Sequence, residues 1–302
     1  MLTIRIILLI SFLFTSFLQL NAQSKSSEKN TRVKVEKRKK KVNKKVKLSK
    51  IDLNNWYVTT PVEGEDGKPI IVEPPEILDY ATNMNLRPYM YTDSIRGTIV
   101  FYAEPTKATT PNSKYSRSEL REQMVPEDNN VNWTFADGGT LKAKLSVDEV
   151  SLDDEGEYHR IIILQIHGRL TNEQRDLIGQ KDNNAPPVLK IYWDKGKIRV
   201  KTKILKDINT PYEQMLHKDA WGDDEGFNFE QKVGFRKFSL EIRVSKGKIV
   251  VVLNNADYKV YENIHLEKWG VFENYFKAGN YFQSRDEGSF AKVSFFELEV
   301  SH

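Results

Sequence analysis

From residue 51 onward the chain is a succession of short β-type runs, and this pattern constrains the fold most. The runs are rich in Val, Ile, Tyr and Phe and are separated by turns of Gly, Asp, Asn and Lys, as in antiparallel sheets. No long segment has helical periodicity, although 171–179 favours a turn or two of helix. These features predict an all-β fold, a β-sandwich or jelly roll. Strands are expected at 97–104, 116–122, 158–168, 188–204, 238–255 and 291–300.

Two of these runs are predicted to be hairpins, because each contains a short turn with glycine. The first turns around Asp194-Lys195-Gly196 and the second around Lys246-Gly247.

A large jelly roll curves one of its sheets into a concave groove. Such a groove suits a chain-like ligand.

Residues 1–22 have the layout of a secretory signal peptide. Arg5 precedes an apolar run that ends at Leu20, and the small residue Ala22 offers a cleavage site. The apolar run is about 15 residues long, whereas a membrane-spanning helix needs about 20. We therefore expect a secreted or periplasmic protein, with an uncleaved membrane anchor as the less favoured alternative. The chain has no Cys, which excludes disulfides, a thiol nucleophile and thiolate metal ligands.

Residues 23–50 form a basic segment. Residues 1–50 hold 14 Lys/Arg and 2 Asp/Glu, which leaves 32 and 40 for the rest of the chain and a net charge of −8 there. We expect 23–50 to be a disordered linker, since it has too few large apolar side chains to offset the entropy of ordering. Its Lys-rich part, 24–50, also offers an electrostatic contact to a cell surface or another polyanion. A nucleic-acid partner is not expected behind a signal peptide. The remaining residues, 51–302, are predicted to be one domain.

Three strand segments carry more polar side chains than a solvated strand needs. The first is SRSELRE at 116–122, where the two-residue period of a strand puts Arg117, Glu119 and Arg121 on one face. Glu119 can hold both guanidinium groups, and a guanidinium fork matches the two oxygens of a carboxylate. The row therefore favours a site for an acidic ligand, with a solvated sheet edge as the alternative.

The second segment is LQIHG at 164–168. Gln165 and His167 lie two residues apart, at the end of an apolar run that is typical of a buried strand. An amide and an imidazole are costly to bury there unless they line a cavity. A single His is more often structural than catalytic, but the polar neighbour on the same face favours a functional role for His167.

The third segment is YFKAGNYFQS at 275–284. Tyr275 and Lys277 share one face, Tyr281 and Gln283 share one face, and the Gly-Asn pair between them is expected to bulge the strand. A cation beside a phenol lowers the pKa of that phenol, which suits proton transfer. A core position or an aromatic platform for a sugar is the alternative for these tyrosines.

The blocks RSELR, QIH and YFKAGNYFQ, in this order, resemble the three conserved blocks of the alginate lyases of polysaccharide lyase family 7, in the alginate lyase 2 superfamily. The resemblance covers residues 51–302 and leaves the basic segment unexplained. It implies a concanavalin-like β-jelly-roll sandwich with a concave substrate groove. It also implies a carbon–oxygen lyase that cleaves alginate, a (1→4)-linked polymer of mannuronate and guluronate, by β-elimination to unsaturated oligouronates. No metal or cofactor is implied, and the partner is the acidic polysaccharide.

Carried onto this sequence, the resemblance implies four catalytic residues. Arg117 and Gln165 would neutralise the uronate carboxylate, which stabilises the enolate-like intermediate. His167 would remove the proton from C5 of guluronate, and Tyr281 would protonate the leaving oxygen on C4. In mannuronate, where proton and leaving group lie on the same side, Tyr281 would act as both base and acid.

The resemblance also implies five substrate-binding residues. Glu119, Arg121 and Lys277 would order the site and bind neighbouring sugars, while Tyr275 and Gln283 are candidates for the groove wall. In this family an Ile between the Gln and His of QIH accompanies guluronate-containing substrates. Ile166 therefore favours guluronate-containing blocks, and its own side chain is expected to point away from the groove.

Other functions stay open. A lyase on another uronan, such as glucuronan, would use the same chemistry. A noncatalytic lectin for acidic polysaccharides would have no need of both His167 and Tyr281. A laminarinase-type hydrolase would need paired carboxylates, whereas the acidic clusters at 153–157 and 223–225 are interpreted as solvated turns or, at most, a cation site. We expect a monomer. The sequence does not distinguish cleavage within the chain from cleavage at its ends.

Overall fold

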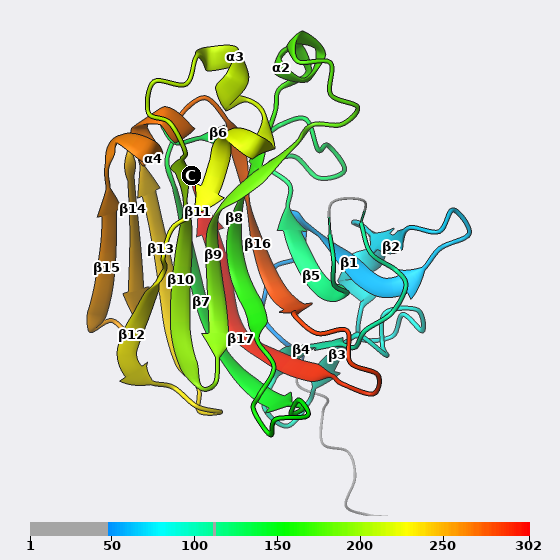
Figure 1. The fold of residues 1–302 in the computed structure, drawn as a ribbon. Coiled ribbons are helices and arrows are strands. Elements are labelled where there is room, and N and C mark those ends of the chain that lie inside the picture. Colours follow the sequence, from blue (N-terminus) through cyan, green and yellow to red (C-terminus); the bar gives the residue numbers. More distant parts are fainter. Residues whose placement is uncertain (1–47, 111–112) are drawn as a thin grey trace, which may run out of the picture. The chain divides into compact units, whose positions relative to one another are not determined.

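The computed structural model describes residues 48–110 and 113–302. The predicted signal peptide and almost all of the basic segment lie outside the described residues, so those predictions stay untested. The described residues form two sheets packed face to face (Figure 1). Every strand pair in the described ranges is antiparallel.

The larger sheet has ten strands and carries the polar segments singled out from the sequence. Eight of its strands follow one another across the sheet in the order β11 (Trp221–Asp223), β10 (Lys197–Leu205), β9 (Asn184–Asp194), β8 (Ile161–Arg169), β16 (Glu273–Phe282), β5 (Arg117–Glu122), β1 (Trp56–Glu63) and β2 (Pro69–Val72). Two short strands complete it: β12 (Phe227–Lys232) pairs with β10, and β6 (Trp133–Thr134) pairs with β16. Strand β16 is therefore the direct neighbour of both β8 and β5, which lie far from it in the sequence.

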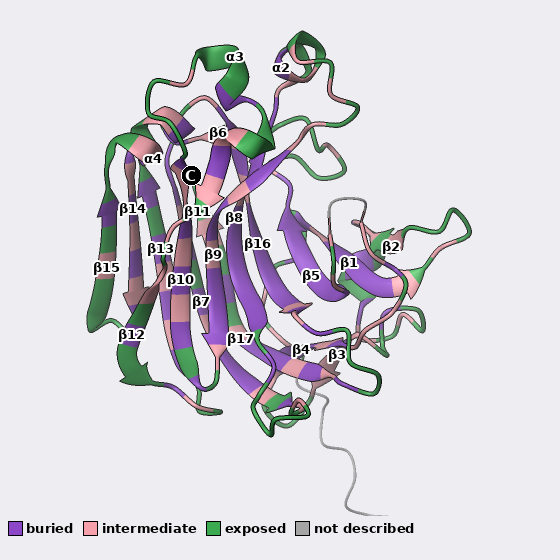
Figure 2. Ribbon diagram, viewed as in Figure 1, coloured by how far each residue is buried: buried purple, intermediate pink, exposed green. Residues whose placement is uncertain are grey.

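The smaller sheet has seven strands and covers the inner face of the first. Their order is β15 (Asp257–Glu262), β14 (Lys248–Leu253), β13 (Phe238–Ser245), β7 (Gly139–Val150), β17 (Ala291–Ser301), β4 (Thr98–Ala103) and β3 (Met90–Asp93). Apolar side chains from both sheets form one continuous core. Figure 2 shows that β8, β16 and β5 are buried along most of their length, whereas β15 is mostly exposed.

Within residues 48–110 and 113–302, helices are few and short. They are the α-helices α2 (Asn172–Leu177), α3 (Tyr212–Met215) and α4 (Ile264–Trp269), and the 3₁₀ helices η1 (Glu76–Asp79) and η2 (Lys218–Ala220). The helix favoured at 171–179 is confirmed as α2, which begins with a capping box between Thr171 and Gln174. In the ranges that the structure describes, no helix is long and apolar enough to cross a membrane.

Both predicted hairpins are confirmed. Strands β9 and β10 join through Lys195 and Gly196, whose φ angles of 51° and 85° match a two-residue turn that follows the twist of the strands. Strands β13 and β14 join through Lys246 and Gly247. Because the register of a hairpin is fixed by its turn, these turns also fix which residues of β9 and β10 face outward.

A register irregularity in β8 explains how an apolar run leads into polar residues. Ile161 and Ile163 face the core, and so do Leu164 and Ile166, because the pairing with β9 shifts between Ile162 and Leu164. Beyond this shift, the alternation places Gln165 and His167 on the outer face of the sheet. Ile166 is fully buried in the core, which confirms that it points away from the outer face.

The predicted bulge at the Gly-Asn pair of β16 is also confirmed, because the register of β16 on β8 shifts between Ala278 and Tyr281. Gly279 has a φ of 145°, and a Cβ there would lie 2.6 Å from the carbonyl oxygen of Ser118 on β5. Only glycine permits this close approach of the two strands. Tyr275, Lys277 and Tyr281 all remain on the outer face of the sheet.

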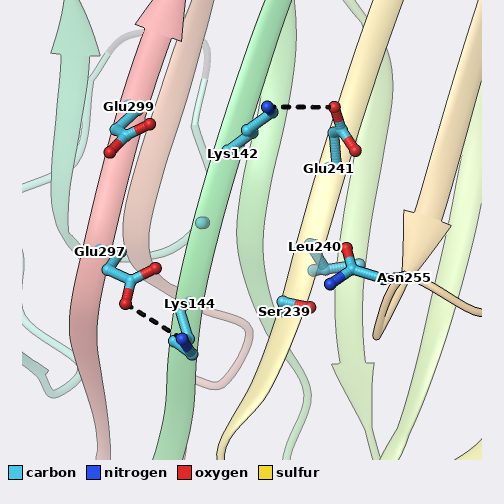
Figure 3. Close-up of a pocket in the computed structure, with 9 residues that line it drawn as sticks. Lys142, Lys144, Ser239, Leu240, Glu241, Asn255, Glu297 and Glu299 are labelled. Atoms are coloured by element: carbon cyan, nitrogen blue, oxygen red, sulfur yellow. Dashed lines mark hydrogen bonds and ion pairs between the residues drawn. The ribbon is translucent and has the colours of Figure 1, made fainter.

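The outer face of the smaller sheet is a ladder of opposite charges (Figure 3). Lys144 on β7 bonds Glu297 on β17 at 3.0 Å, and Lys142 on β7 lies 3.8 Å from Glu241 on β13. These lysines lie between Glu297 and Glu299 of β17 on one side and Glu241 of β13 on the other. Their charge is thus compensated within the sheet, as on a solvated surface.

Candidate active site

A groove of about 930 Å³ lies over the outer face of the larger sheet. Its floor comes from strands β1, β5, β8, β9, β10 and β16, and its sides include Thr110, residues 113 to 115 and residues 182 to 187. Eight of the nine residues singled out from the sequence line it: Arg117, Arg121, Gln165, His167, Tyr275, Lys277, Tyr281 and Gln283. The ninth, Glu119, is fully buried beneath them. The pairing of β5, β16 and β8 brings the three polar segments together.

The Glu119 carboxylate holds three of these side chains at once. It accepts hydrogen bonds from Arg117 Nη1 at 3.0 Å and Gln165 Nε2 at 2.6 Å, and it pairs with Lys277 Nζ at 2.5 Å. Burial alone would raise the pKa of Glu119, but the charges of Lys277 and Arg117 hold it below its usual value. The carboxylate is therefore ionised and fixes two cations and an amide at the groove floor.

Lys277 is a buried ammonium with an altered acidity. Burial and the nearby charge of Arg117 lower its pKa to about 8, against the opposing attraction of Glu119. Lys277 is therefore cationic at neutral pH but close to its titration range. Together with Arg117 and Arg121 it makes this part of the groove strongly positive, although the rest of the domain is acidic.

Tyr281 lies against Arg117. The Arg117 Cζ atom is 3.7 Å from the centroid of the Tyr281 ring, and the two residues face each other across β16 and β5. Arg117 Nη2 also donates a hydrogen bond to Ser113 Oγ, and Tyr115 contacts the edge of the Tyr281 ring. The side-chain amide of Gln283 donates to the backbone oxygen of Tyr281. The Tyr281 phenol thus lies in the groove with its ring packed against the guanidinium group of Arg117.

His167 has a defined tautomer. Its Nδ1 lies 2.9 Å from the carbonyl oxygen of Gly168, and since a carbonyl can only accept, Nδ1 carries the proton. The other ring nitrogen, Nε2, therefore keeps its lone pair. Burial, followed by the charge of Lys277, lowers the pKa of His167 to about 3. The imidazole is neutral at neutral pH and can act as a base.

Tyr275 lies between His167 and Arg121. Its ring is parallel to the imidazole within 10°, with 5.2 Å between centroids, and Arg121 Cζ lies 4.1 Å from the Tyr275 centroid. The expectation that a cation lowers the pKa of the phenol is wrong for Tyr275. Burial raises that pKa, and the opposing influence of Arg121 does not compensate. Lys277 instead pairs with Glu119.

The groove also contains residues that the sequence patterns did not single out. Lys190 on β9 and Lys203 on β10 line it and share the carboxylate of Asp223, at 2.7 and 2.8 Å. The interpretation of 223–225 as a solvated turn is therefore only partly right, because Asp223 and Glu225 are exposed but Asp223 is paired with two lysines of the groove. Asp223 belongs to β11, and Asp224 accepts hydrogen bonds from the backbone and hydroxyl of Thr202. The two-residue period places Lys190 and Tyr192 on one face of β9, a signal that was present in the sequence.

In the two described ranges, no group of three or more His, Asp or Glu side chains is arranged to hold a metal ion. The groove instead combines three kinds of group on one surface. Cationic and amide donors can bind a carboxylate, a neutral imidazole can accept a proton, and a phenol can donate one. Such a set fits proton abstraction beside a carboxylate, followed by departure of a neighbouring oxygen.

Comparisons with known proteins agree with this chemistry. A family model for alginate lyase matches residues 51–302. The solved alginate lyase A1-II', a member of polysaccharide lyase family 7, is 30% identical with a TM-score of 0.65, covering 83% of this chain and 96% of that one. A variant of A1-II' solved with the substrate GGMG is 28% identical with a TM-score of 0.65, covering 84% of this chain and 94% of that one.

A curated alginate lyase of Klebsiella pneumoniae is also similar, with 25% identity over 295 residues, 84% of this chain and 90% of that protein. The jelly-roll prediction is confirmed, because the two-sheet sandwich is shared with the solved lyases. The family model spans the whole domain from residue 51. The chain therefore belongs to the alginate lyase family.

Proposed function

We propose that this protein cleaves alginate by β-elimination in the groove over the larger sheet, and that guluronate-containing blocks are its preferred substrate. Arg117, Gln165 and Lys277 bind and neutralise the carboxylate of the uronate whose proton is removed. This neutralisation makes the C5 proton more acidic, because negative charge develops on the carboxylate as that proton leaves.

The rest of the reaction removes one proton from C5 of the sugar and donates one proton to the departing oxygen. His167 Nε2 takes the C5 proton of guluronate, the C5–H electron pair forms the C4–C5 double bond, and the C4–O bond breaks. Tyr281 gives its phenolic proton to the departing oxygen. For mannuronate, Tyr281 serves as both base and acid. Each of the two groups supplies general acid–base catalysis, for which about 10² to 10⁴-fold is typical.

The observation that carries the proposal is the state of His167. A neutral imidazole with its lone pair on Nε2 lines the same groove as the Tyr281 phenol and the cationic cluster around Glu119. A lectin needs the cations alone, and a hydrolase needs paired carboxylates. The proposed preference for guluronate rests on Ile166, because an Ile at this position matches the family pattern for guluronate-containing substrates.

We also propose how the protein is exported and held. Residues 1–22 direct export and are removed, and residues 23–50 act as a basic tether to an acidic polysaccharide or a cell surface, screened first by added salt. The domain at 51–302 acts as a monomer. No metal or cofactor takes part in the proposed reaction.

The test is the ultraviolet absorbance of the unsaturated uronate, measured with purified protein and excess chelator on guluronate-rich alginate, mannuronate-rich alginate and glucuronan. A rise that is fastest on guluronate-rich alginate supports the proposal. A rise on glucuronan alone assigns the lyase to another uronan. Folded protein that binds alginate without any rise in absorbance contradicts the lyase and favours a lectin.

A further inference from the structure

We propose that Tyr275 is a positioning residue that holds the imidazole of His167 in the orientation needed for proton abstraction, rather than a wall of the substrate groove. This inference rests on the proposed function of His167 as the base for guluronate. Tyr275 stands directly opposite His167 in the pairing of β16 with β8. Its phenol ring lies parallel to the imidazole, at 10° and 5.2 Å between centroids.

The Tyr275 ring is itself fixed from the other side. Strand β16 lies between β8 and β5, so Arg121 of β5 reaches Tyr275 from the side away from His167. Its Cζ atom is 4.1 Å from the Tyr275 centroid and 5.5 Å from that of Tyr57 on β1. Four flat groups, Tyr57, Arg121, Tyr275 and His167, therefore follow one another across four neighbouring strands.

Arg121, the second group of this row, is anchored by hydrogen bonds. Arg121 donates to the side-chain oxygens of Asn129 and Asn132, in the loop between β5 and β6. Arg121 is only 4% exposed, so its position is not set by solvent. A cation placed on an aromatic face is attracted to it, and the ring in turn restricts the stacked imidazole.

In this row, Tyr275 controls the orientation of the plane of the His167 imidazole. The hydrogen bond from Nδ1 to Gly168 fixes one atom of the imidazole, but a single bond to one atom does not fix the plane of the ring. The parallel phenol ring sets that plane and so sets the direction of the Nε2 lone pair. A misplacement of about 1 Å at a reacting group costs about 100-fold in rate.

The test compares Tyr275→Leu and Tyr275→Phe with His167→Ala, using kcat and KM on poly-guluronate and on poly-mannuronate separately. Tyr275→Leu removes the ring, and we expect kcat on poly-guluronate to fall by at least about tenfold. We expect kcat on poly-mannuronate, which does not use His167, to stay within about threefold. Tyr275→Phe keeps the ring and should keep both activities.

The outcomes separate this inference from the proposed function. A partly unfolded variant loses both activities alike, so the ratio between the two polymers is the readout. A raised KM on both polymers with unchanged kcat in Tyr275→Leu means that Tyr275 is a wall of the groove, which overturns the inference. A selective loss in His167→Ala without one in Tyr275→Leu overturns it too. An equal loss on both polymers in His167→Ala contradicts the proposed function of His167 itself.

Discussion

Glu119 and Lys277 form an ion pair of 2.5 Å at the floor of the groove, between a glutamate that solvent does not reach and a lysine that is 6% exposed. The same carboxylate binds Arg117 and Gln165. One buried charge therefore sets the positions of three groups that we propose to bind the uronate carboxylate. Burying an ion pair gains little net free energy, but breaking one leaves an unpaired charge in the protein.

The first prediction concerns removal of that carboxylate. Glu119→Gln leaves Lys277 and Arg117 without their counter-charge, and we expect the free energy of unfolding to fall by about 3–5 kcal/mol. The matched control is Glu297→Gln on the opposite sheet, where the exposed pair with Lys144 contributes about 0–1 kcal/mol. Urea denaturation measures both variants. Equal losses in the two contradict the central role of Glu119.

The second prediction is an alkaline limit to activity. Because the pKa of Lys277 is about 8, raising the pH through this value removes a positive charge from the groove, and we expect kcat/KM on alginate to decline. Stability changes in the opposite direction. Between pH 8 and the ordinary lysine pKa of 10.5 the unfolded chain binds more protons at this residue, so the Lys277 contribution to stability rises with pH. A pH–rate profile with parallel denaturation curves checks both, and a flat rate across pH 8 contradicts the prediction.

The third prediction concerns the bulge in β16. Gly279→Ala places a Cβ 2.6 Å from the backbone oxygen of Ser118, so the two strands must separate. We expect destabilisation of about 2 kcal/mol or more together with loss of activity, because backbone strain of this kind costs about 1–3 kcal/mol before any clash. Gly156→Ala is the control: it also has a positive φ, of 79°, but a Cβ there meets nothing within 4 Å. Similar thermal shifts in the two variants would show that the close approach is unimportant.

The fourth prediction concerns His302, which does not line the groove. Burial lowers its pKa, but the 2.7 Å contact with Glu122 outweighs burial and raises it above 6.5. The resulting stabilisation is fully present below pH 6.5 and is lost as the pH rises through the higher folded-state value. The pKa of His167 is lowered, so its contribution to stability has the opposite dependence on pH. That contribution is lost as the pH falls below 6.5.

The measurement is the free energy of unfolding at a series of pH values between 6.5 and 8, below the range in which the Lys277 contribution rises. We expect the native chain to lose stability as the pH rises through this range, and His302→Ala to lose less of it. The carboxylate of Glu122 keeps its bonds from Trp133 Nε1 and the backbone of Phe276 in that variant. Parallel slopes in the two proteins contradict this assignment.

The strands and hairpins of the fold follow from local patterns, so the sequence predicts them. Turn residues such as Lys195-Gly196 and the alternation in Arg117, Glu119 and Arg121 act within a few residues of the chain. The order of the strands is a different matter, because pairing β5 with β16 joins residues far apart in the sequence. The three polar segments could be placed in one site only through their similarity to a known family.

The missed residues have a physical explanation as well. Asp223 resembles part of a solvated acidic turn, and its pairing with Lys190 and Lys203 depends on the short strand β11 docking beside β10. The pKa of Tyr275 was expected to fall beside a cation, yet burial dominates it. Burial depends on the packing of whole sheets, which a local pattern does not contain.

The most direct test of the account is the initial rate of unsaturated uronate formation by Tyr281→Phe on poly-guluronate and poly-mannuronate, with alginate binding measured in parallel. Tyr281 is the proposed proton donor on both polymers, and Phe keeps the ring that lies on Arg117. We predict unchanged binding and a fall in rate of at least about 100-fold on both. A variant that keeps its rate within tenfold of the native protein on either polymer would contradict the account.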